Sequence, residues 1–475
     1  MSRGDTSGYG GADGKFHRRR DRNGSHEPRS RRAVLGTPTL TALVVGNMIG
    51  AGVFTTSGFA LADLGSPWTV LFAWLVGGAV ALCGALGYGA LARLLPASGG
   101  EYVYLSRNVH PVAGFVAGWV SLLAGFTAAI GYAALTFAAY ALPEGRGAEG
   151  VLPALLASGV IMMAALLHGL RLGIGTRVQN AAVAIKLIAM IGFAAFAVLG
   201  SGGVTSWPGV AELRASAGPA SPASIAAFAL AVMWISFSYS GFNAAVYIAG
   251  EVPAARARVP RAMLVGTALT MLLYVALNAV FVLVPPFDAV AGREDVAVAA
   301  ARVLGGEWLV GALRAIVALA LFTSVSAMIM IGPRVYAKMA DDGLMPRVLR
   351  FEGETPFVAV MAQAALAVGV VWITGLRELL SYLGFTLSLC AALTVASLFV
   401  VQRRDPARVA GLPGFSWAPA IFVAATLLFA VLAARQQPAE LIAALVTVVS
   451  GAGLYVIVRR RAPISNPPPD DAASR

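Results

Sequence analysis

The chain has 475 residues, of which 58% are hydrophobic and 12% charged, and its formal net charge at pH 7 is +12. Soluble domains carry roughly 25% charged residues, so this composition excludes a soluble globular protein and indicates an all-α polytopic membrane protein in a lipid bilayer. The basic residues collect in particular loops, which argues against nucleic acid as a partner. The two cysteines, Cys83 and Cys390, lie inside apolar runs, so we predict no disulfide framework, no metal site and no cofactor.

Two tails flank one membrane domain. Residues 1–38 are polar and rich in arginine and lack the apolar core of a signal peptide, so we expect a disordered cytoplasmic tail there and a second one at residues 460–475. Residues 39–459 between them are expected to form a single membrane domain. Its apolar runs predict twelve transmembrane helices, at about residues 39–63, 69–95, 112–141, 151–170, 178–200, 224–250, 261–284, 309–339, 357–374, 379–401, 417–434 and 441–458.

The basic residues orient these helices, because cytoplasmic loops of membrane proteins carry an excess of Lys and Arg. If the first tail is cytoplasmic, the loops on its side contain Arg93, Arg107, Arg171, Arg177, Arg256, Arg258, Arg261, Arg334, Lys338, Arg347, Arg350, Arg403, Arg404, Arg408 and Arg459 to Arg461. The opposite side contains Arg146, Arg214, Arg293, Arg302, Arg377 and Arg435. This alternation predicts a multi-pass protein of the cell membrane with both termini in the cytoplasm.

The first run reads TLTALVVGNMIGAGVFTTSGFALAD and has glycines at its centre. Gly50 and Gly52 flank Ala51, and glycine is among the weakest helix formers, so the helix is expected to open there. Backbone groups opened at this depth need polar partners, which suggests a binding site. The alternative is an unbroken helix whose small residues permit close packing.

The sixth run reads FALAVMWISFSYSGFNAAVYIAGEV and is also interrupted at its centre. The interrupting residues are Ser236, Ser238, Ser240, Gly241 and Asn243. Serine and asparagine compete for backbone hydrogen bonds and help a helix to open, although the serines could instead bond back within an intact helix. Interrupted spans at matching places predict an inverted repeat, with residues 39–200 and 224–401 as its halves and helices 11 and 12 (417–458) outside it.

Lys186 is the one clearly mid-span ionisable residue, in the fifth run. A charge at the bilayer centre costs at least ~2.5–3.5 kcal/mol, so we expect its ammonium to face the interior near carbonyls of the broken first run. Snorkelling is the alternative. In the eighth run Thr323, Ser324 and Ser326 could line the interior beside it, or bond within their own helix.

Two carboxylates, Glu101 after the second run and Glu251 at the end of the sixth, could pair with basic residues to close the cytoplasmic side; the alternative is a solvated surface position. No HExxH, GxSxG, Walker A or dinucleotide motif is present, so we predict that the protein is not an enzyme.

Three stretches, GNMIGAGVF, SYSGFNAAVYIAGEV and GPRVYAKMADDGLMP, resemble the first, sixth and eighth helices of the amino acid–polyamine–organocation (APC) transporters. The resemblance covers about residues 37–404. It implies the leucine-transporter-type 5+5 inverted repeat, in a twelve-helix version with discontinuous helices 1 and 6.

The resemblance also implies site residues. In the family, amides of the broken first helix hold the substrate carboxylate, and carbonyls of the first and sixth helices hold its ammonium. These positions match Ala51 and Gly52 for the carboxylate, and Met48, Phe237 and Ser240 for the ammonium. The full predicted substrate site is Met48, Ile49, Gly50, Ala51, Gly52, Phe237, Ser238, Ser240, Gly241, Asn243 and Met328, and the predicted proton-coupling set is Lys186, Ser324 and Ser326.

Two residues narrow the function that the resemblance implies. Relatives that exchange arginine for agmatine carry an aromatic residue where this chain has Met328, and they lack the lysine found here at Lys186. The lysine matches relatives thought to be proton-coupled. We therefore predict secondary active transport, a proton-coupled symport of neutral L-amino acids. The alternatives are an amino acid exchanger without net proton coupling and, more remotely, a membrane-embedded enzyme or receptor.

Overall fold

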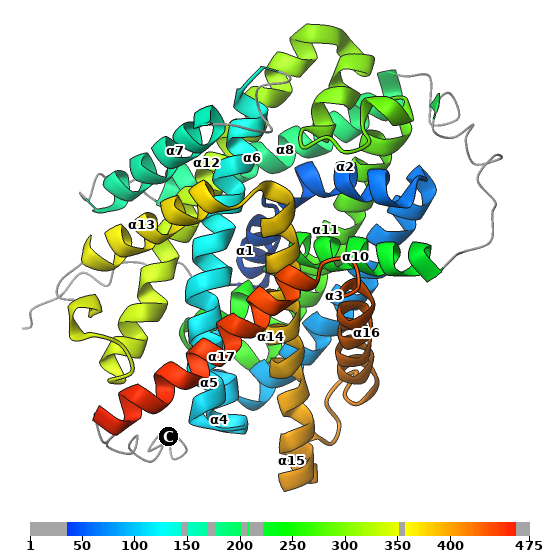
Figure 1. The fold of residues 1–475 in the computed structure, drawn as a ribbon. Coiled ribbons are helices and arrows are strands. Elements are labelled where there is room, and N and C mark those ends of the chain that lie inside the picture. Colours follow the sequence, from blue (N-terminus) through cyan, green and yellow to red (C-terminus); the bar gives the residue numbers. More distant parts are fainter. Residues whose placement is uncertain are drawn as a thin grey trace, which may run out of the picture. The chain divides into compact units, whose positions relative to one another are not determined.

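The computed structural model describes residues 36–143, 151–169, 176–200, 207–208, 222–350 and 357–461, and these form helices with no strand among them. The helices are, in chain order, α1 Thr37–Met48, α2 Gly52–Leu64, α3 Pro67–Leu94, α4 Gly100–Asn108, α5 Pro111–Val120, η1 Ser121–Ala128, α6 Ala129–Ala141, α7 Val151–Gly169, α8 Thr176–Gly200, α10 Pro222–Ser238, η4 Ala244–Glu251, α11 Ala255–Leu283, η5 Phe287–Ala289, α12 Val296–Asp341, η6 Arg347–Leu349, α13 Phe357–Ile373, α14 Leu376–Arg404, α15 Pro406–Val409, α16 Trp417–Ala433 and α17 Pro438–Arg461. Figure 1 shows their arrangement.

Most of the predicted runs appear as long apolar helices. Within the described ranges, eight helices are long and apolar enough to cross a membrane, or nine if the bent pair α1 and α2 counts as one span. The remaining three runs correspond to shorter apolar helices, Ser224–Ser238, Phe357–Ile373 and Trp417–Ala433. Helices of 15 to 17 residues lie at or below the lower limit for a span, which is about 17 residues. The all-helical, polytopic class is confirmed, and the count of twelve spans stays a prediction.

The first run is broken where its glycines predict. Helix α1 ends at Met48, α2 begins at Gly52, and the two axes meet at 45°. Between them Ile49 has an extended backbone, with φ −74° and ψ 90°. The apolar sequence is therefore interrupted by a short non-helical segment rather than by a bend within a continuous helix.

The sixth run is broken as well, and its second half differs from the α-helix expected there. Helix α10 ends at Ser238, and after a turn the chain continues as the 3₁₀-helix η4. Gly241 in the turn has φ +96°, a conformation that other residues rarely adopt. This glycine therefore permits the sharp change of direction.

Two further irregularities were not predicted. The third run contains a π-helical stretch, η1, between α5 and α6. Helix α12 is 46 residues long because two helices join across Gly306, whose φ of +65° is non-helical. The part after Gly306 corresponds to the predicted eighth span at residues 309–339.

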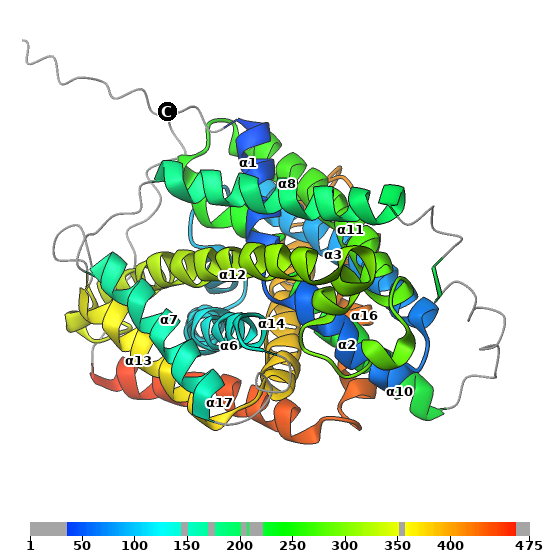
Figure 2. The same cartoon turned by 90° about the horizontal axis from the view of Figure 1, so that it is seen from above.

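The helices enclose the two breaks. Helix α11 packs along α3 and α1, and α10 packs against α2, α14 and α16. Helix α12 contacts α6, α7 and α8, and in Figure 2 it crosses between α8 on one side and α6 and α7 on the other. The predicted tails lie largely outside the described residues, since α1 begins at Thr37 and the description ends at Arg461. Arg146, Arg171 and Arg214 also lie outside the described residues, and the side chains of Arg177, Arg334, Lys338 and Arg461 are not described.

Candidate functional site

The breaks in the first and sixth runs touch each other. A Cβ atom on Gly241 would lie 3.0 Å from the carbonyl oxygen of Asn47 and 3.3 Å from the amide nitrogen of Met48. Ordinary contacts of a Cβ atom lie at 3.4–4 Å, so a side chain at this position would press against the first span. A Cβ atom on Gly52 would lie 3.0 Å from the Cα of Ser238. The two non-helical segments therefore form one junction, which we call the break junction (residues 47–52 and 237–243).

The junction brings together helix ends of opposite polarity. Helix α2 begins with Ala51 as its N-cap, which supplies no side-chain hydrogen bond to the amides of the first turn. Unpaired amides and the positive end of the helix dipole favour an anionic group there. The C-terminal ends of α1 and α10 present carbonyl oxygens, which favour a cation. An amino acid zwitterion carries both kinds of charge.

Some of these carbonyls already have donors. The Tyr274 hydroxyl, on α11, donates to the carbonyl of Met48 at 2.6 Å and lies 3.3 Å from the carbonyl of Ser238. The amide of Ser240 donates to the carbonyl of Phe237 at 2.9 Å. Tyr274 therefore ties both breaks to α11, a role that the sequence analysis missed. The sequence feature that indicates this role is a tyrosine within an apolar run, because a buried hydroxyl needs a hydrogen-bond partner.

The Lys186 ammonium lies at the first break. The side chain of Lys186 comes from α8 and is 4% exposed. Its Nζ donates to the carbonyl oxygen of Ile49 at 2.6 Å and lies 3.5 Å from that of Gly46. The ammonium thus contacts carbonyls of the broken first span, as the sequence analysis expected, and it does not snorkel to the surface.

The hydroxyls of α12 bond elsewhere. Ser324 donates to the carbonyl of Ala320 at 3.0 Å, within its own helix, and Thr323 does the same at 2.8 Å. The Ser326 hydroxyl is buried and lies 2.7 Å from Nε2 of His168 on α7. Lys186 bonds to α1 and its C-cap, so the structure does not bring these serines onto the lysine.

Not all of the side chains predicted to surround the substrate lie together in the structure. Ser238 lies 3.2 Å, hydroxyl to hydroxyl, from Thr56 of α2. The ring of Phe237 packs edge-on against Tyr132 of α6, with centroids 5.2 Å apart, and the Tyr132 hydroxyl bonds to Thr55. The sequence analysis did not include Thr55, Thr56 and Tyr132. Met328 is partly buried on α12, and its carbonyl lies 3.5 Å from the Gln363 amide nitrogen.

Glu101 is placed differently from both sequence interpretations. Its side chain, on α4, is only 7% exposed and accepts hydrogen bonds from Tyr88, Asn243 and Tyr247, at 2.8, 2.5 and 2.6 Å. These donors are neutral, so the carboxylate is neither solvated nor held by a basic residue in these contacts. Asn243, predicted to bind substrate, uses its amide here. The exposed Glu251 fits the solvated interpretation.

A second polar contact holds the opposite end of α2. Arg377, at the start of α14, forms a salt bridge of 2.7 Å with Asp63, and its guanidinium lies 5.2 Å from the Trp234 ring centre and 6.0 Å from that of Phe59. These contacts join α2, α10 and α14, and the sequence analysis did not predict them. In the part of the chain that is described, no group of three or more His, Cys, Asp or Glu residues could hold a metal ion.

Known proteins are similar in sequence to this chain over most of its length. The profile of a family described as "Amino acid permease" matches residues 35–450. The Asc-type amino acid transporter 1 of Homo sapiens is 27% identical over 388 residues, which cover 78% of this chain and 72% of the relative. The large neutral amino acids transporter small subunit 2 of Homo sapiens is 28% identical over 387 residues, 78% of this chain and 70% of the relative. The b(0,+)-type amino acid transporter 1 of Mus musculus is 25% identical over 428 residues, 87% of this chain and 85% of the relative. The chain therefore belongs to the amino acid permease family of membrane transporters, within the APC superfamily that its motifs resemble.

Proposed function

We propose that this permease carries neutral L-amino acids together with protons across the cell membrane by alternating access. The observation that carries the proposal is the buried Lys186 ammonium bonded to the carbonyl of Ile49 at the first break. A group that can gain and lose a proton thereby contacts the same non-helical segment that would bind substrate. Proton binding and substrate binding would then act on one arrangement of helices, which is the requirement for coupling.

The backbone of the substrate would bind across the break junction. Its carboxylate would accept hydrogen bonds from the amides of Ala51 and Gly52, with Gly50 permitting the open backbone. Its ammonium would contact carbonyls at the ends of α1 and α10, including those of Met48 and Ser240. The bond from Tyr274 to Met48 does not exclude this, because a carbonyl oxygen can accept two hydrogen bonds.

The side chain of the substrate would meet apolar and hydroxyl groups. Phe237, Ser238 and Met328 supply no charge, which favours a neutral substrate of small to medium size. The name of one relative, the large neutral amino acids transporter small subunit 2, agrees with the neutral class. Asn243 would act indirectly, through its hydrogen bond to Glu101.

The proton-coupling set centres on Lys186 and would include the α12 hydroxyls only in another conformation. Ser324 bonds within its helix and Ser326 bonds to His168. In alternating access the two repeats move against each other, so these hydroxyls could face the lysine at another stage of the cycle.

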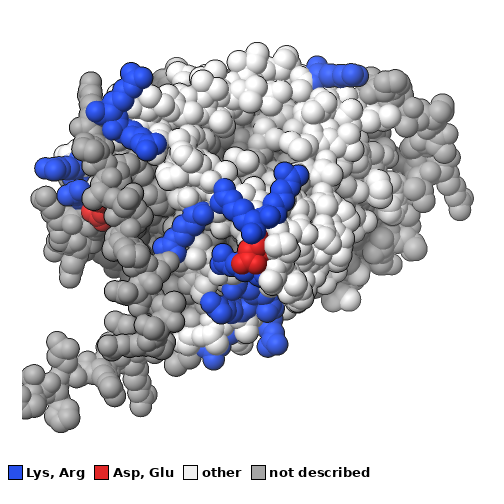
Figure 3. All heavy atoms as spheres, turned by 90° about the horizontal axis from the view of Figure 1, so that it is seen from below, with Lys and Arg blue, Asp and Glu red and all other residues white. Residues whose placement is uncertain are grey.

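The proposal includes the predicted topology of twelve spans, two inverted repeats at residues 39–200 and 224–401, and both termini in the cytoplasm. Arg403 and Arg404 end α14, and Arg408 follows in α15. Figure 3 views the molecule from the lower side of Figure 1, where α4 and α15 lie, and Lys and Arg side chains gather on this face with few acidic ones among them. A basic face of this kind supports a cytoplasmic orientation.

Uptake into proteoliposomes tests the proposal. We expect an imposed inward proton gradient to drive accumulation of a labelled neutral amino acid into liposomes that contain no amino acid. An exchanger would accumulate label only with amino acid inside, and an enzyme or receptor would show no counterflow. Preferential competition by arginine, lysine or glutamate would contradict the neutral substrate class.

A further inference from the structure

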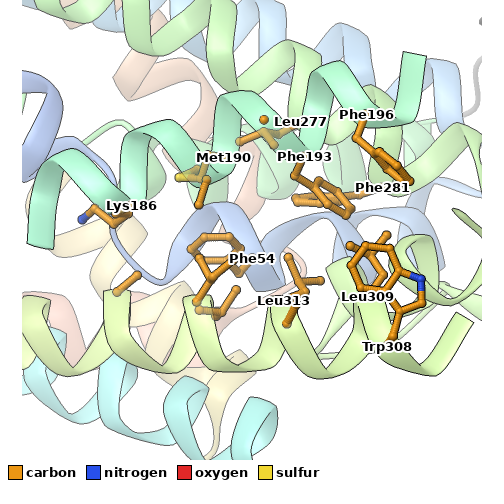
Figure 4. A pocket seen from close by; sticks show the side chains of 16 residues that line it. Phe54, Lys186, Met190, Phe193, Phe196, Leu277, Phe281, Trp308, Leu309 and Leu313 are labelled. Carbon is orange, nitrogen blue, oxygen red and sulfur yellow. The ribbon is translucent and has the colours of Figure 1, made fainter. Parts of the chain in front are cut away.

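A cavity of about 260 Å³ lies between α8 and α12. No residue of the break junction lines it, and Lys186 is the residue that connects the two, because it lines the cavity and donates to Ile49. Its walls include Met190 and Phe193 of α8, Leu313 of α12, Phe281 of α11 and Phe54 of α2. Figure 4 shows these side chains, with Lys186 at one end of the cavity and Trp308 at the other. We call this cavity the α8–α12 crevice.

The walls of the crevice are apolar. Lys186 is the one charged residue among those that line it, and its ammonium donates to Ile49 and Gly46 of the first span. The crevice therefore offers an aliphatic stem rather than a charge. A zwitterionic amino acid buried there would leave its carboxylate and ammonium unpaired, which is strongly unfavourable. The occupant that fits must be apolar along its length.

The crevice is about as long as one bilayer leaflet is thick. From Lys186 to Phe196 the lining of α8 covers ten residue steps, or roughly 15 Å at the rise of an α-helix. Half of the hydrocarbon core of a bilayer is also roughly 15 Å. Trp308, 67% exposed, lies at the far end, and tryptophan is enriched at the membrane–water interface. The crevice thus extends from an interfacial residue to the mid-depth lysine.

The crevice is continuous with the face of α8 that meets lipid. Only 22% of Val183–Gly200, the apolar part of this helix, is buried. Ile188, Ile191 and Leu199 are exposed, the last to 83%. In a membrane transporter such a face contacts acyl chains. Phe196 belongs to both surfaces, because it lines the crevice and is itself exposed. An acyl chain can therefore enter from the side without crossing a polar barrier.

We propose that the α8–α12 crevice binds one acyl chain of a membrane lipid from the leaflet at the Trp308 end. The chain would lie between α8 and α12 with its end beside Phe54 and the stem of Lys186. It would thereby support α8, the helix that carries the lysine, against the α2 half of the broken span. This lipid site is distinct from the break junction and does not depend on the nature of the transported substrate.

Photolabelling in liposomes tests the site, with a phosphatidylcholine that carries a diazirine in its acyl chain. Phe193 and Leu313 are only 8% and 6% exposed, so label on them reports a chain inside the crevice, whereas label on Ile188 reports surrounding lipid. We expect the wild type to carry label at all three positions after peptide mapping by mass spectrometry. Label confined to Ile188 and other exposed positions would overturn the proposal.

Filling the crevice provides the matched comparison. A Cβ atom at Gly192, in the lining of α8, meets no atom within 4 Å, so Gly192→Leu can add bulk there without a clash at Cβ. Gly369 on α13 is equally unhindered and lies outside the lining, so Gly369→Leu is the control. We expect Gly192→Leu to lose label at Phe193 and Leu313 but to keep it at Ile188, and Gly369→Leu to match the wild type.

A second variant covers the case in which Gly192→Leu does not fold. Ala312→Leu narrows the crevice from the α12 wall and should produce the same selective loss. Full label at Phe193 in a folded variant that fills the crevice would also overturn the proposal.

Discussion

Replacement of Lys186 by alanine is the sharpest test of the proposed coupling of protons to transport. The variant removes the donor that lies 2.6 Å from the carbonyl of Ile49. A hydrogen bond with a charged donor stabilises by roughly 1.5–3 kcal/mol, and 1.4 kcal/mol corresponds to about a tenfold change in an equilibrium constant. We therefore expect the balance between the tied and released arrangements of α8 and α1 to shift by about 10- to 150-fold.

The assay compares gradient-driven uptake with equilibrium binding. Uptake is measured in liposomes with an imposed inward proton gradient, and binding of the same amino acid is measured in detergent. Lys186→Ala should abolish accumulation driven by the gradient and should weaken binding much less, because the predicted substrate contacts are mainly to backbone groups. Lys186→Arg should bind substrate but not respond to pH, because a guanidinium does not deprotonate in proteins. Arg435→Ala, which removes an exposed basic side chain, is the control and should behave as the wild type.

Full gradient-driven accumulation by Lys186→Ala would refute this reasoning. The lysine would then be a structural donor to the first break, and the proton would need another carrier. Glu101 would become the first candidate, because it is buried and bonded to η4, whereas Glu251 is exposed.

Three other sets of substitutions test the contacts that hold α2, α4 and α10 in place. Gly52→Val should abolish uptake without preventing membrane insertion, since even its Cβ would lie 3.0 Å from the α10 backbone; wild-type uptake would exclude the proposed junction. Glu101→Gln should lower the melting temperature of the purified protein, because hydrogen bonds to a charged group contribute roughly 1.5–3 kcal/mol. An unchanged melting curve would show that the hydrogen bonds to Glu101 contribute little to stability. Asp63→Arg or Arg377→Asp alone should reduce uptake, and the double exchange should restore part of it. The effect should be modest, because a partly exposed ion pair contributes only about 0.2–1 kcal/mol, and no rescue would argue against the salt bridge as the cause.

The positions of the helices could be predicted from the sequence because they depend on local properties. The second predicted run, residues 69–95, corresponds to α3 at Pro67–Leu94, and the break at residues 49–51 follows from the flanking glycines. Apolar length and helix propensity need no knowledge of the neighbouring helices. The π-helical stretch η1 had no such signal, since its sequence SLLAGFTA is an ordinary apolar segment.

The polar contacts were less predictable because each depends on which helices pack together. Asn243 was expected to face the substrate from its position at the break, but its amide donates to Glu101, which lies 142 residues earlier in the chain. Ser326 was predicted either to line the interior beside Lys186 or to bond within its own helix, and its hydroxyl instead contacts His168. The residue type predicts that each buried polar side chain has a hydrogen-bond partner. Which residue is the partner depends on tertiary packing.

The two donors at the first break differ chemically, so the proposed mechanism gives them different roles. Tyr274 bonds to Met48 and lies close to Ser238, so it joins both breaks to α11. A tyrosine hydroxyl donates in its neutral form and ordinarily stays neutral near pH 7, so this contact is insensitive to the proton gradient. Lys186 donates its hydrogen bonds to the first break, and the charge of its ammonium strengthens them. Loss of the proton would therefore weaken the contact between α8 and α1. The hydroxyl of Tyr274 would still hold the two breaks together, so α8 could move away while the break junction stays intact.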